Sequence, residues 1–141
     1  MLDLANMTWT RVETTGTGPS ARAAHGGCVV GERLVVFGGR DAQGRQSDTW
    51  TLDLPSSAWR CPGEQHAAPA GRSFNTLVAL PGAVPAALSF GGMSTDGGAL
   101  KHTLEVLDMR DFRWRTIDGA TAGWPSKRFV ALRTHTRTAG R

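Results

Sequence analysis

The sequence predicts an all-β protein built from repeated four-stranded antiparallel sheets. A short phrase with Leu-Asp near its start and Trp at its end occurs three times, in residues 2–9, 52–59 and 107–114. The spacings between its Trp residues are 50 and 55 residues. An apolar run that ends in Phe-Gly-Gly occurs twice, at residues 37–39 and 90–92. A period near 50 residues with a Gly doublet and a late Trp is typical of one blade of a β-propeller.

Within each repeat, four short runs of apolar and β-branched residues are separated by turn residues, as expected for an antiparallel meander. The first repeat predicts strands at 28–30, 33–37, 49–54 and 58–61. The second repeat predicts them at 74–80, 86–90, 103–109 and 112–117. Residues 40–47 have the composition of a loop. Neither repeat shows helical periodicity, so no helix of useful length is expected between residues 20 and 118.

The repeat pattern divides the chain into five expected segments. They are the third and fourth strands of a preceding half-blade (1–13), two blades (14–63 and 64–119), the start of a third blade (120–134) and a disordered basic tail (135–141). A closed propeller needs about four or more blades. We therefore expect an incomplete ring of about two and a half blades, with open blade edges that favour association. Such a chain would be a fragment of a longer protein, part of a ring-completing oligomer, or a segment docked on another protein.

The repeated residues resemble the Kelch repeat, whose pattern is Pro followed by Arg-x-x-His, then Gly-Gly, then an aromatic or aliphatic residue before Asp, and finally Trp. The first repeat matches fully, at Pro19, Arg22, His25, Gly38, Gly39, Leu52, Asp53 and Trp59. The second matches at Pro69, Arg72, Gly91, Gly92, Leu107, Asp108 and Trp114. It has Asn75 in place of His, and the third repeat has only Pro125 and Arg128, with Ala131 in the His position. The resemblance covers about residues 1–130 and implies a Kelch β-propeller, a fold that serves many functions.

Several repeated residues are expected to have structural roles. The doublets Gly38-Gly39 and Gly91-Gly92 end the second strand, where glycine permits a positive φ and close backbone approach. Recurrence at one blade position indicates packing between blades for Trp9, Trp59 and Trp114. Trp124 lies outside the repeat pattern and fits either an exposed contact or local packing.

The meander places two sets of loops at the same end of the blades. These are the loops that connect successive blades and the loops between the second and third strands, and we call them the loop rim (residues 14–21, 40–47, 63–71, 93–102 and 118–127). Function tends to reside on such loops. The candidate partner-binding residues are Arg22, Arg40, Asp41, Arg45, Arg72, Lys101, His102 and Trp124. For the arginines that begin each repeat, Arg22, Arg72 and Arg128, the first interpretation is a hydrogen-bonded brace for the neighbouring loop. The resemblance to Kelch domains implies the other interpretation, an Arg near the rim of the binding face.

The sequence argues against an enzyme and against a metal or cofactor site. It lacks a G-x-S-x-G nucleophile motif, and the Gly doublet at residue 38 is not followed by the Lys-Ser/Thr of a phosphate loop. The four His residues have no metal-ligand spacing. The Kelch fold occurs in a copper-radical oxidase, but that chemistry needs Tyr, which this chain lacks entirely. The expected function is therefore a protein-interaction module or scaffold. The alternative is a fragment of a larger Kelch-containing protein whose activity lies elsewhere.

The formal net charge of +4 arises from the C-terminal end of the chain. Residues 1–126 carry eleven Lys and Arg against all twelve acidic residues, whereas residues 127–141 carry five cations and no acid. A basic tail rather than a basic domain face makes nucleic acid an unlikely partner, and weak binding of RNA or an acidic surface by the tail is the remaining alternative. No apolar run reaches the roughly 20 residues of a membrane helix, and no leader pattern is present. We therefore expect a cytoplasmic protein that does not bind membranes and keeps Cys28 and Cys61 reduced.

Overall fold

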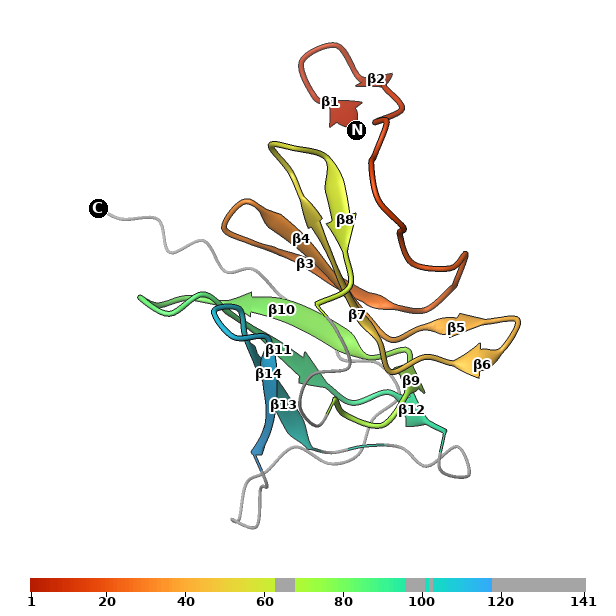
Figure 1. Ribbon diagram of the computed structural model, residues 1–141, viewed down its shortest axis with the longest axis vertical. Helices are drawn as coiled ribbons and strands as arrows, with labels where there is room; N and C mark the ends of the chain where they lie inside the picture. The colour runs from red at the N-terminus through yellow and green to blue at the C-terminus, as the bar shows by residue number, and fades with distance from the viewer. Residues whose placement is uncertain (63–67, 96–100, 102, 118–141) are drawn as a thin grey trace.

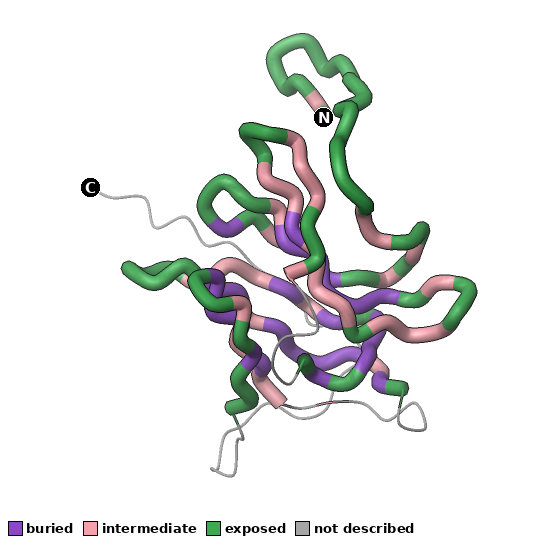
Figure 2. Tube along the Cα trace, in the orientation of Figure 1, coloured by how far each residue is buried: buried purple, intermediate pink, exposed green. Residues whose placement is uncertain are grey.

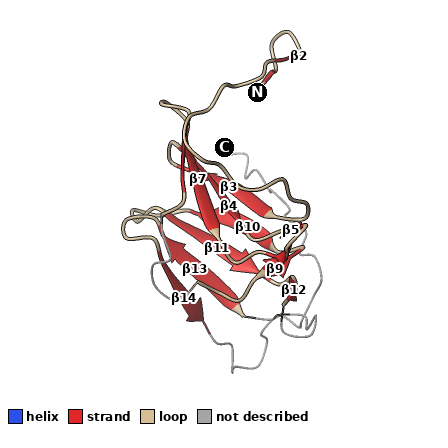
Figure 3. Cartoon of the chain, turned by 45° about the vertical axis from the view of Figure 1, so that its right-hand side comes forward, coloured by secondary structure: helices blue, strands red, loops and turns tan. Residues whose placement is uncertain are grey.

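The computed structural model describes residues 1–62, 68–95, 101 and 103–117. Throughout these residues the chain forms β-strands connected by turns and loops, and the described part contains no helix (Figure 3). The all-β class predicted from the sequence is confirmed. The sheets are antiparallel and do not close into a ring. His102, Trp124, the expected start of a third blade (120–134) and the tail (135–141) lie outside the described residues.

Two four-stranded antiparallel meanders make up most of the structure (Figure 1). The first sheet contains β3 (Gly26–Val30), β4 (Arg33–Phe37), β7 (Thr49–Asp53) and β8 (Ala58–Arg60), in that order. The second sheet contains β10 (Thr76–Leu80), β11 (Ala86–Phe90), β13 (Leu104–Asp108) and β14 (Arg113–Ile117), in the same order. These strands lie within one or two residues of the predicted ones, because β-branched and apolar runs bounded by Gly, Pro and Asp define them locally.

The two sheets pack face to face, with their first strands β3 and β10 side by side. Buried residues gather where the sheets meet, as the purple segments of Figure 2 show. The core contains Val30, Val35, Phe37, Leu77, Ala87, Leu107, Met109 and Trp114. The core therefore contains residues from both sheets. A single sheet cannot cover its own apolar face and has to pack against a second one.

The Gly doublets allow close backbone approach, between the repeats at Gly38 and within the second repeat at Gly92. All four glycines have a positive φ, between 69° for Gly38 and 96° for Gly39. A Cβ on Gly38 would lie 2.5 Å from the carbonyl oxygen of Arg72, which belongs to the next repeat. A Cβ on Gly92 would lie 2.8 Å from the carbonyl oxygen of Ser73. The sequence expectation for these doublets is confirmed, since both the backbone angle and the close approach exclude a side chain.

Two short ladders accompany the sheets at one end, where the sequence predicted only loops. Strands β5 (Arg40–Asp41) and β6 (Gly44–Arg45) form a small hairpin. Strand β9 (Arg72–Ser73) pairs with β12 (Met93–Ser94), which joins two segments far apart in the sequence. Pairs of two-residue strands carry no periodicity, so the sequence could not distinguish them from loop.

The N-terminal residues form a separate hairpin of β1 (Leu2–Asp3) and β2 (Thr8–Trp9), which stands apart from the two sheets in Figure 1. Its Trp9 is 76% exposed, whereas Trp114 is only 7% exposed and Trp59 is half-buried. The expectation that all three Trp side chains pack between blades therefore fails for Trp9. Trp114 of the second sheet packs on Phe37 of the first, with ring centroids 4.5 Å apart, and no described sheet stands in that position for Trp9.

The repeated Asp fixes the turn between the third and fourth strands of each unit. Oδ1 of Asp3 accepts a hydrogen bond from the amide of Ala5, at 2.8 Å. Oδ1 of Asp53 accepts one from the amide of Ser56, at 3.0 Å, and Asp108 does the same for Arg110. Asp favours turns because its carboxylate binds backbone amides two or three residues further along. This structural role explains the recurring Leu-Asp phrase.

The described residues contain neither a membrane-spanning helix nor a cluster of metal ligands. No helix there is long and apolar enough to cross a membrane. No group of three or more His, Cys, Asp or Glu is placed to hold a metal ion in the same residues. Among the described residues, neither Cys28 nor Cys61 forms a disulfide.

Candidate partner-binding face

The described parts of the loop rim lie at one end of both sheets, on the right-hand side of Figure 1. Ala23 forms an antiparallel β-bridge with Arg40, and this pairing connects the segment before β3 to the loop after β4. The β9–β12 ladder makes the equivalent connection in the second repeat. The prediction that the two kinds of loop share one end is confirmed by this pairing. The opposite end carries the tight hairpin turns.

Arg22, a predicted contact residue, points into the structure. Its side chain is 4% exposed and forms an ion pair with Asp48, with Nη2 2.9 Å from Oδ2. Its Nη1 also donates to the carbonyl oxygen of Gly38 at 3.0 Å. Burial raises the pKa of Asp48, but hydrogen bonds from Arg22 and Trp50 outweigh that effect and lower it overall. Arg22 is thus a brace between two loops, and a partner contact through Arg22 stays a prediction.

Arg72 occupies the equivalent position of the second repeat and is also inside. Its side chain is 2% exposed, and Nη2 lies 3.4 Å from Oε1 of Glu105. Glu105 accepts further hydrogen bonds from the hydroxyls of Thr103, at 2.8 Å, and Thr116, at 2.7 Å. The guanidinium also lies 5.9 Å from the ring centroid of Phe37, in the first sheet. The structure therefore shows Arg72 as a hydrogen-bonded brace, and a partner contact through Arg72 stays a prediction.

Asp41 and Arg45 lie on the β5–β6 hairpin and are half-buried. The Ser20 hydroxyl donates to Asp41 at 2.6 Å, and this bond lowers the pKa of that carboxyl together with bonds from Gln43 and Gln46. Arg45 Nε donates to the Ser73 hydroxyl at 3.0 Å, which connects the hairpin to β9. Both residues therefore hold the rim in shape while presenting part of their surface.

Arg40 is the predicted contact residue that the structure leaves most open. It is exposed in β5, directly across the hairpin from Arg45. Lys101 is half-buried, and its amide donates to the carbonyl oxygen of Gly92 at 3.0 Å, which places it beside the second Gly doublet. The sequence analysis missed the exposed Ser20 and Gln43 of the same rim. Uncharged polar loop residues carry no sequence signal that separates them from solvent-facing residues elsewhere.

The rim is therefore a hydrogen-bonded framework with a few charged and polar groups on its surface. Two Arg–acid pairs and the short ladders fix its backbone, whereas Arg40, Gln43 and parts of Arg45 and Asp41 face outward. A preformed polar surface of this kind suits recognition of another macromolecule, because little conformational entropy is lost on binding.

Comparison with known proteins places these repeats in a family. Residues 1–137 match the model of the KLHDC2/KLHL20/DRC7 Kelch-repeats domain. Bovine (Bos taurus) Kelch domain-containing protein 2 is 38% identical over 96 residues, which cover 68% of this chain and 23% of that protein. Acyl-CoA-binding domain-containing protein 4 of Arabidopsis thaliana is 31% identical over 118 residues, covering 83% of this chain and 17% of that protein. The chain thus spans less than a quarter of either relative. It belongs to the Kelch-repeat family, and its two four-stranded sheets are Kelch propeller blades.

Proposed function

We propose that this chain is a protein-interaction module that binds its partner through the loop rim. Kelch-repeat domains are in general protein-interaction modules, and this chain belongs to that family. The observation that carries the proposal is the rigid β5–β6 hairpin, which presents Arg40 and Gln43 outward at the end where the longer loops gather. Residues 14–63 and 64–119 are proposed as the two blades that support this face.

Some arginines of the loop rim hold the fold together, and others face solvent. Only an arginine that faces solvent is suitable for a mutation that tests the proposal. Arg22 and Arg72 are unsuitable, because their replacement would break buried ion pairs. Arg45 also holds the hairpin to Ser73. Arg40→Glu changes the charge of the rim at an exposed site, and it should leave the fold intact.

Photo-crosslinking tests the face directly. A photoreactive residue at position 43 samples the rim, and one at position 84, in the exposed turn between β10 and β11, samples the opposite end. After irradiation in cells that express the chain, we expect position 43 to cross-link a defined protein that mass spectrometry identifies. We expect Arg40→Glu to remove that product. Arg115→Glu, an exposed charge reversal on β14, serves as the matched control and should leave the product unchanged.

Cross-links from position 84 alone, or an equal product with Arg40→Glu, would contradict binding at the rim. Far-ultraviolet circular dichroism and thermal melting of each variant establish that lost cross-linking does not reflect lost folding. A product that both charge reversals remove would indicate a general electrostatic attraction and would also contradict the proposed face.

A second candidate is a role as the Kelch part of a larger protein whose activity lies in another segment. The chain spans only 23% and 17% of two curated relatives, so those proteins contain further segments beside the matched Kelch repeats. The length of the open reading frame in the source gene distinguishes this candidate from an autonomous module. Binding by the rim is compatible with both.

A further inference from the structure

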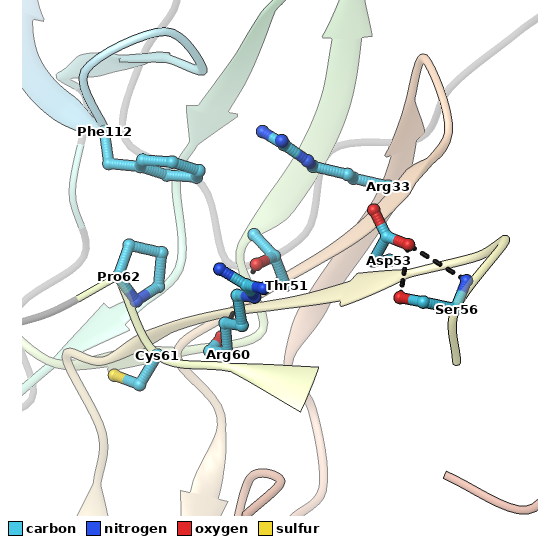
Figure 4. Close-up of a pocket in the computed structure, with 8 residues that line it drawn as sticks. All are labelled: Arg33, Thr51, Asp53, Ser56, Arg60, Cys61, Pro62 and Phe112. Carbon is cyan, nitrogen blue, oxygen red and sulfur yellow. Dashed lines mark hydrogen bonds between the residues drawn. The ribbon is translucent and has the colours of Figure 1, made fainter. Parts of the chain in front are cut away.

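A groove with a volume of about 840 Å³ lies between the two blades, and none of its lining residues belongs to the loop rim. The first sheet contributes most of its wall, from β4, β7, β8 and the turn between β7 and β8, and the turn between β13 and β14 closes it (Figure 4). Its lining residues are Arg33, Thr51, Asp53, Ser56, Arg60, Cys61, Pro62 and Phe112. Both blades that form it are four-stranded sheets, and its wall includes β8, the last strand of the first sheet.

The residues that line the groove carry a net positive charge. Arg33 of β4 and Arg60 of β8 extend into the same space from the two strands on either side of β7, and Asp53 of β7 lies directly across from Arg33 (Figure 4). Asp53 is held by Ser56, whose hydroxyl and amide donate to Oδ1 at 2.5 and 3.0 Å. Among the described residues, neither guanidinium lies within ion-pairing distance of an acid. Two cations against one carboxylate leave a site that favours an anion.

An apolar surface adjoins the two arginines. The Phe112 ring projects over the groove, and the Arg33 guanidinium carbon lies 5.8 Å from its centroid (Figure 4). Pro62 lies on the other side of the same space. Phe112 has a φ of 55° in the turn that Asp108 and Asp111 stabilise, which fixes the position from which its ring projects. A planar guest could therefore stack at the Arg33–Phe112 surface while its charge meets the guanidinium groups.

We propose that this groove binds a small organic anion that carries an aromatic ring. The anionic group lies between Arg33 and Arg60, and the ring packs against Phe112 and Pro62. Guanidinium groups bind carboxylate and phosphate with charge-assisted hydrogen bonds, so either head group fits the shared chemistry. The volume lies in the range of known small-molecule sites, which is about 300–1,000 Å³. This site is distinct from the loop rim, and its failure would leave the rim proposal unaffected.

Titration of the isotope-labelled chain, followed by amide chemical shifts, tests the site with three probes. Phenyl phosphate and 3-phenylpropanoate carry the two anionic head groups, and 2-phenylethanol is the neutral control. We expect at least one anion to bind saturably in the millimolar range, as suits so small a ligand, and to shift the amides of Arg33, Arg60 and Phe112. The better anion identifies the preferred head group. The alcohol should bind about tenfold more weakly, because it lacks the charge.

Three variants assign the binding to the proposed residues. Arg60→Gln, at an exposed position, should weaken anion binding about tenfold. Phe112→Leu keeps apolar bulk but removes the ring, and it should weaken the aromatic anions while leaving acetate, a non-aromatic anion, unchanged. Arg115→Gln, which removes an exposed arginine outside the groove, should have no effect. The proposal is overturned if neither anion binds, if the neutral alcohol binds equally well, or if Arg115→Gln weakens binding as much as Arg60→Gln.

Discussion

The backbone amide of Gly39 donates a hydrogen bond to the carbonyl oxygen of Arg72, with an N···O distance of 2.8 Å. This bond joins the end of β4 in the first blade to the start of the second repeat. The Arg72 amide donates in turn to the carbonyl oxygen of Gln46, at 3.1 Å, so Arg72 is bonded twice to the preceding blade. The junction between the blades is therefore a backbone contact that depends on the absence of side chains at the Gly doublet.

Gly38→Ala should destabilise the chain strongly, because a Cβ there would lie 2.5 Å from the Arg72 carbonyl oxygen. Gly31→Ala is the matched control, since Gly31 also has a positive φ, of 59°, but a Cβ at that position would meet nothing within 4 Å. Both variants incur backbone strain, and only the first adds a steric clash. We expect Gly38→Ala to lose about 1–3 kcal/mol more of the free energy of unfolding than Gly31→Ala, as measured by urea denaturation. Equal losses would show that the blades do not approach closely at this point.

Glu105→Gln should cost about 3 kcal/mol in the free energy of unfolding, because it leaves the buried Arg72 guanidinium without its carboxylate. Glu13→Gln offers the contrast, since the Arg11–Glu13 pair is 88% and 86% exposed and contributes below about 1 kcal/mol. Chemical denaturation of both variants at low and at high salt checks the difference. A loss at Glu105 no larger than that at Glu13 would mean that the buried pair is solvated.

Trp114→Ala should destabilise the chain by about 3–5 kcal/mol, because its ring packs on Phe37 and its Nε1 donates to the Thr49 hydroxyl at 3.0 Å. Trp9→Ala, at the same position of the repeat, should change stability by less than about 0.5 kcal/mol because Trp9 is 76% exposed. Thermal unfolding of the two variants provides the test. A large loss in Trp9→Ala would show that the N-terminal hairpin packs on a blade in solution.

Asp108 should titrate well below an ordinary carboxyl group. Hydrogen bonds from the Arg110 side chain and amide lower its pKa from 3.8 to about 2. Because the folded-state pKa is lowered, this carboxylate stabilises the fold above pH 3.8, and that contribution is lost as the pH falls toward 2. Carboxyl-carbon chemical shifts measured against pH should give the low value, and Arg110→Gln should raise it. Arg113→Gln, which removes a neighbouring cation, should leave it nearly unchanged.

The N-terminal hairpin should promote association of the chain. Its exposed apolar residues are Met1, Leu4, Met7 and Trp9, each about 70% exposed or more. We expect sedimentation to show a concentration-dependent increase in mass, because exposed apolar surface favours contacts between molecules. Replacing Leu4 and Trp9 with Ser should reduce it. A monomer at all concentrations that binds no hydrophobic dye would contradict this expectation.

The fold could be predicted because its determinants repeat and act locally. Apolar runs between turn residues define the strands, and the Gly doublets at 38 and 91 mark the positive φ angles at which the second strands end. Trp9 shows the limit of this reasoning. A repeat assigns it the same position as Trp114, but burial depends on a neighbouring sheet, which is a property of the whole structure.

The candidate site was predicted less well, for a physical reason. Its loops could be located from the meander, but the direction in which each side chain points depends on partners distant in sequence. Arg22 pairs with Asp48 and Arg72 with Glu105, 26 and 33 residues away. Nothing in a single sequence distinguishes these buried arginines from Arg40, which faces solvent. The groove beside Phe112 could not be predicted from the sequence either, because its walls come from separate repeats.

The contiguous strand order of each blade has a consequence for cooperativity. Each of the two described blades is formed from consecutive chain, and the contacts between them include the packing of β3 on β10, the Phe37–Trp114 ring pair and the Gly39–Arg72 bond. Such an arrangement behaves as a nearly one-dimensional array, in which stability is the sum of intrinsic terms and nearest-neighbour couplings. Sequence changes at one junction therefore alter how far unfolding of one blade propagates to the next, while the internal architecture of each blade is unchanged.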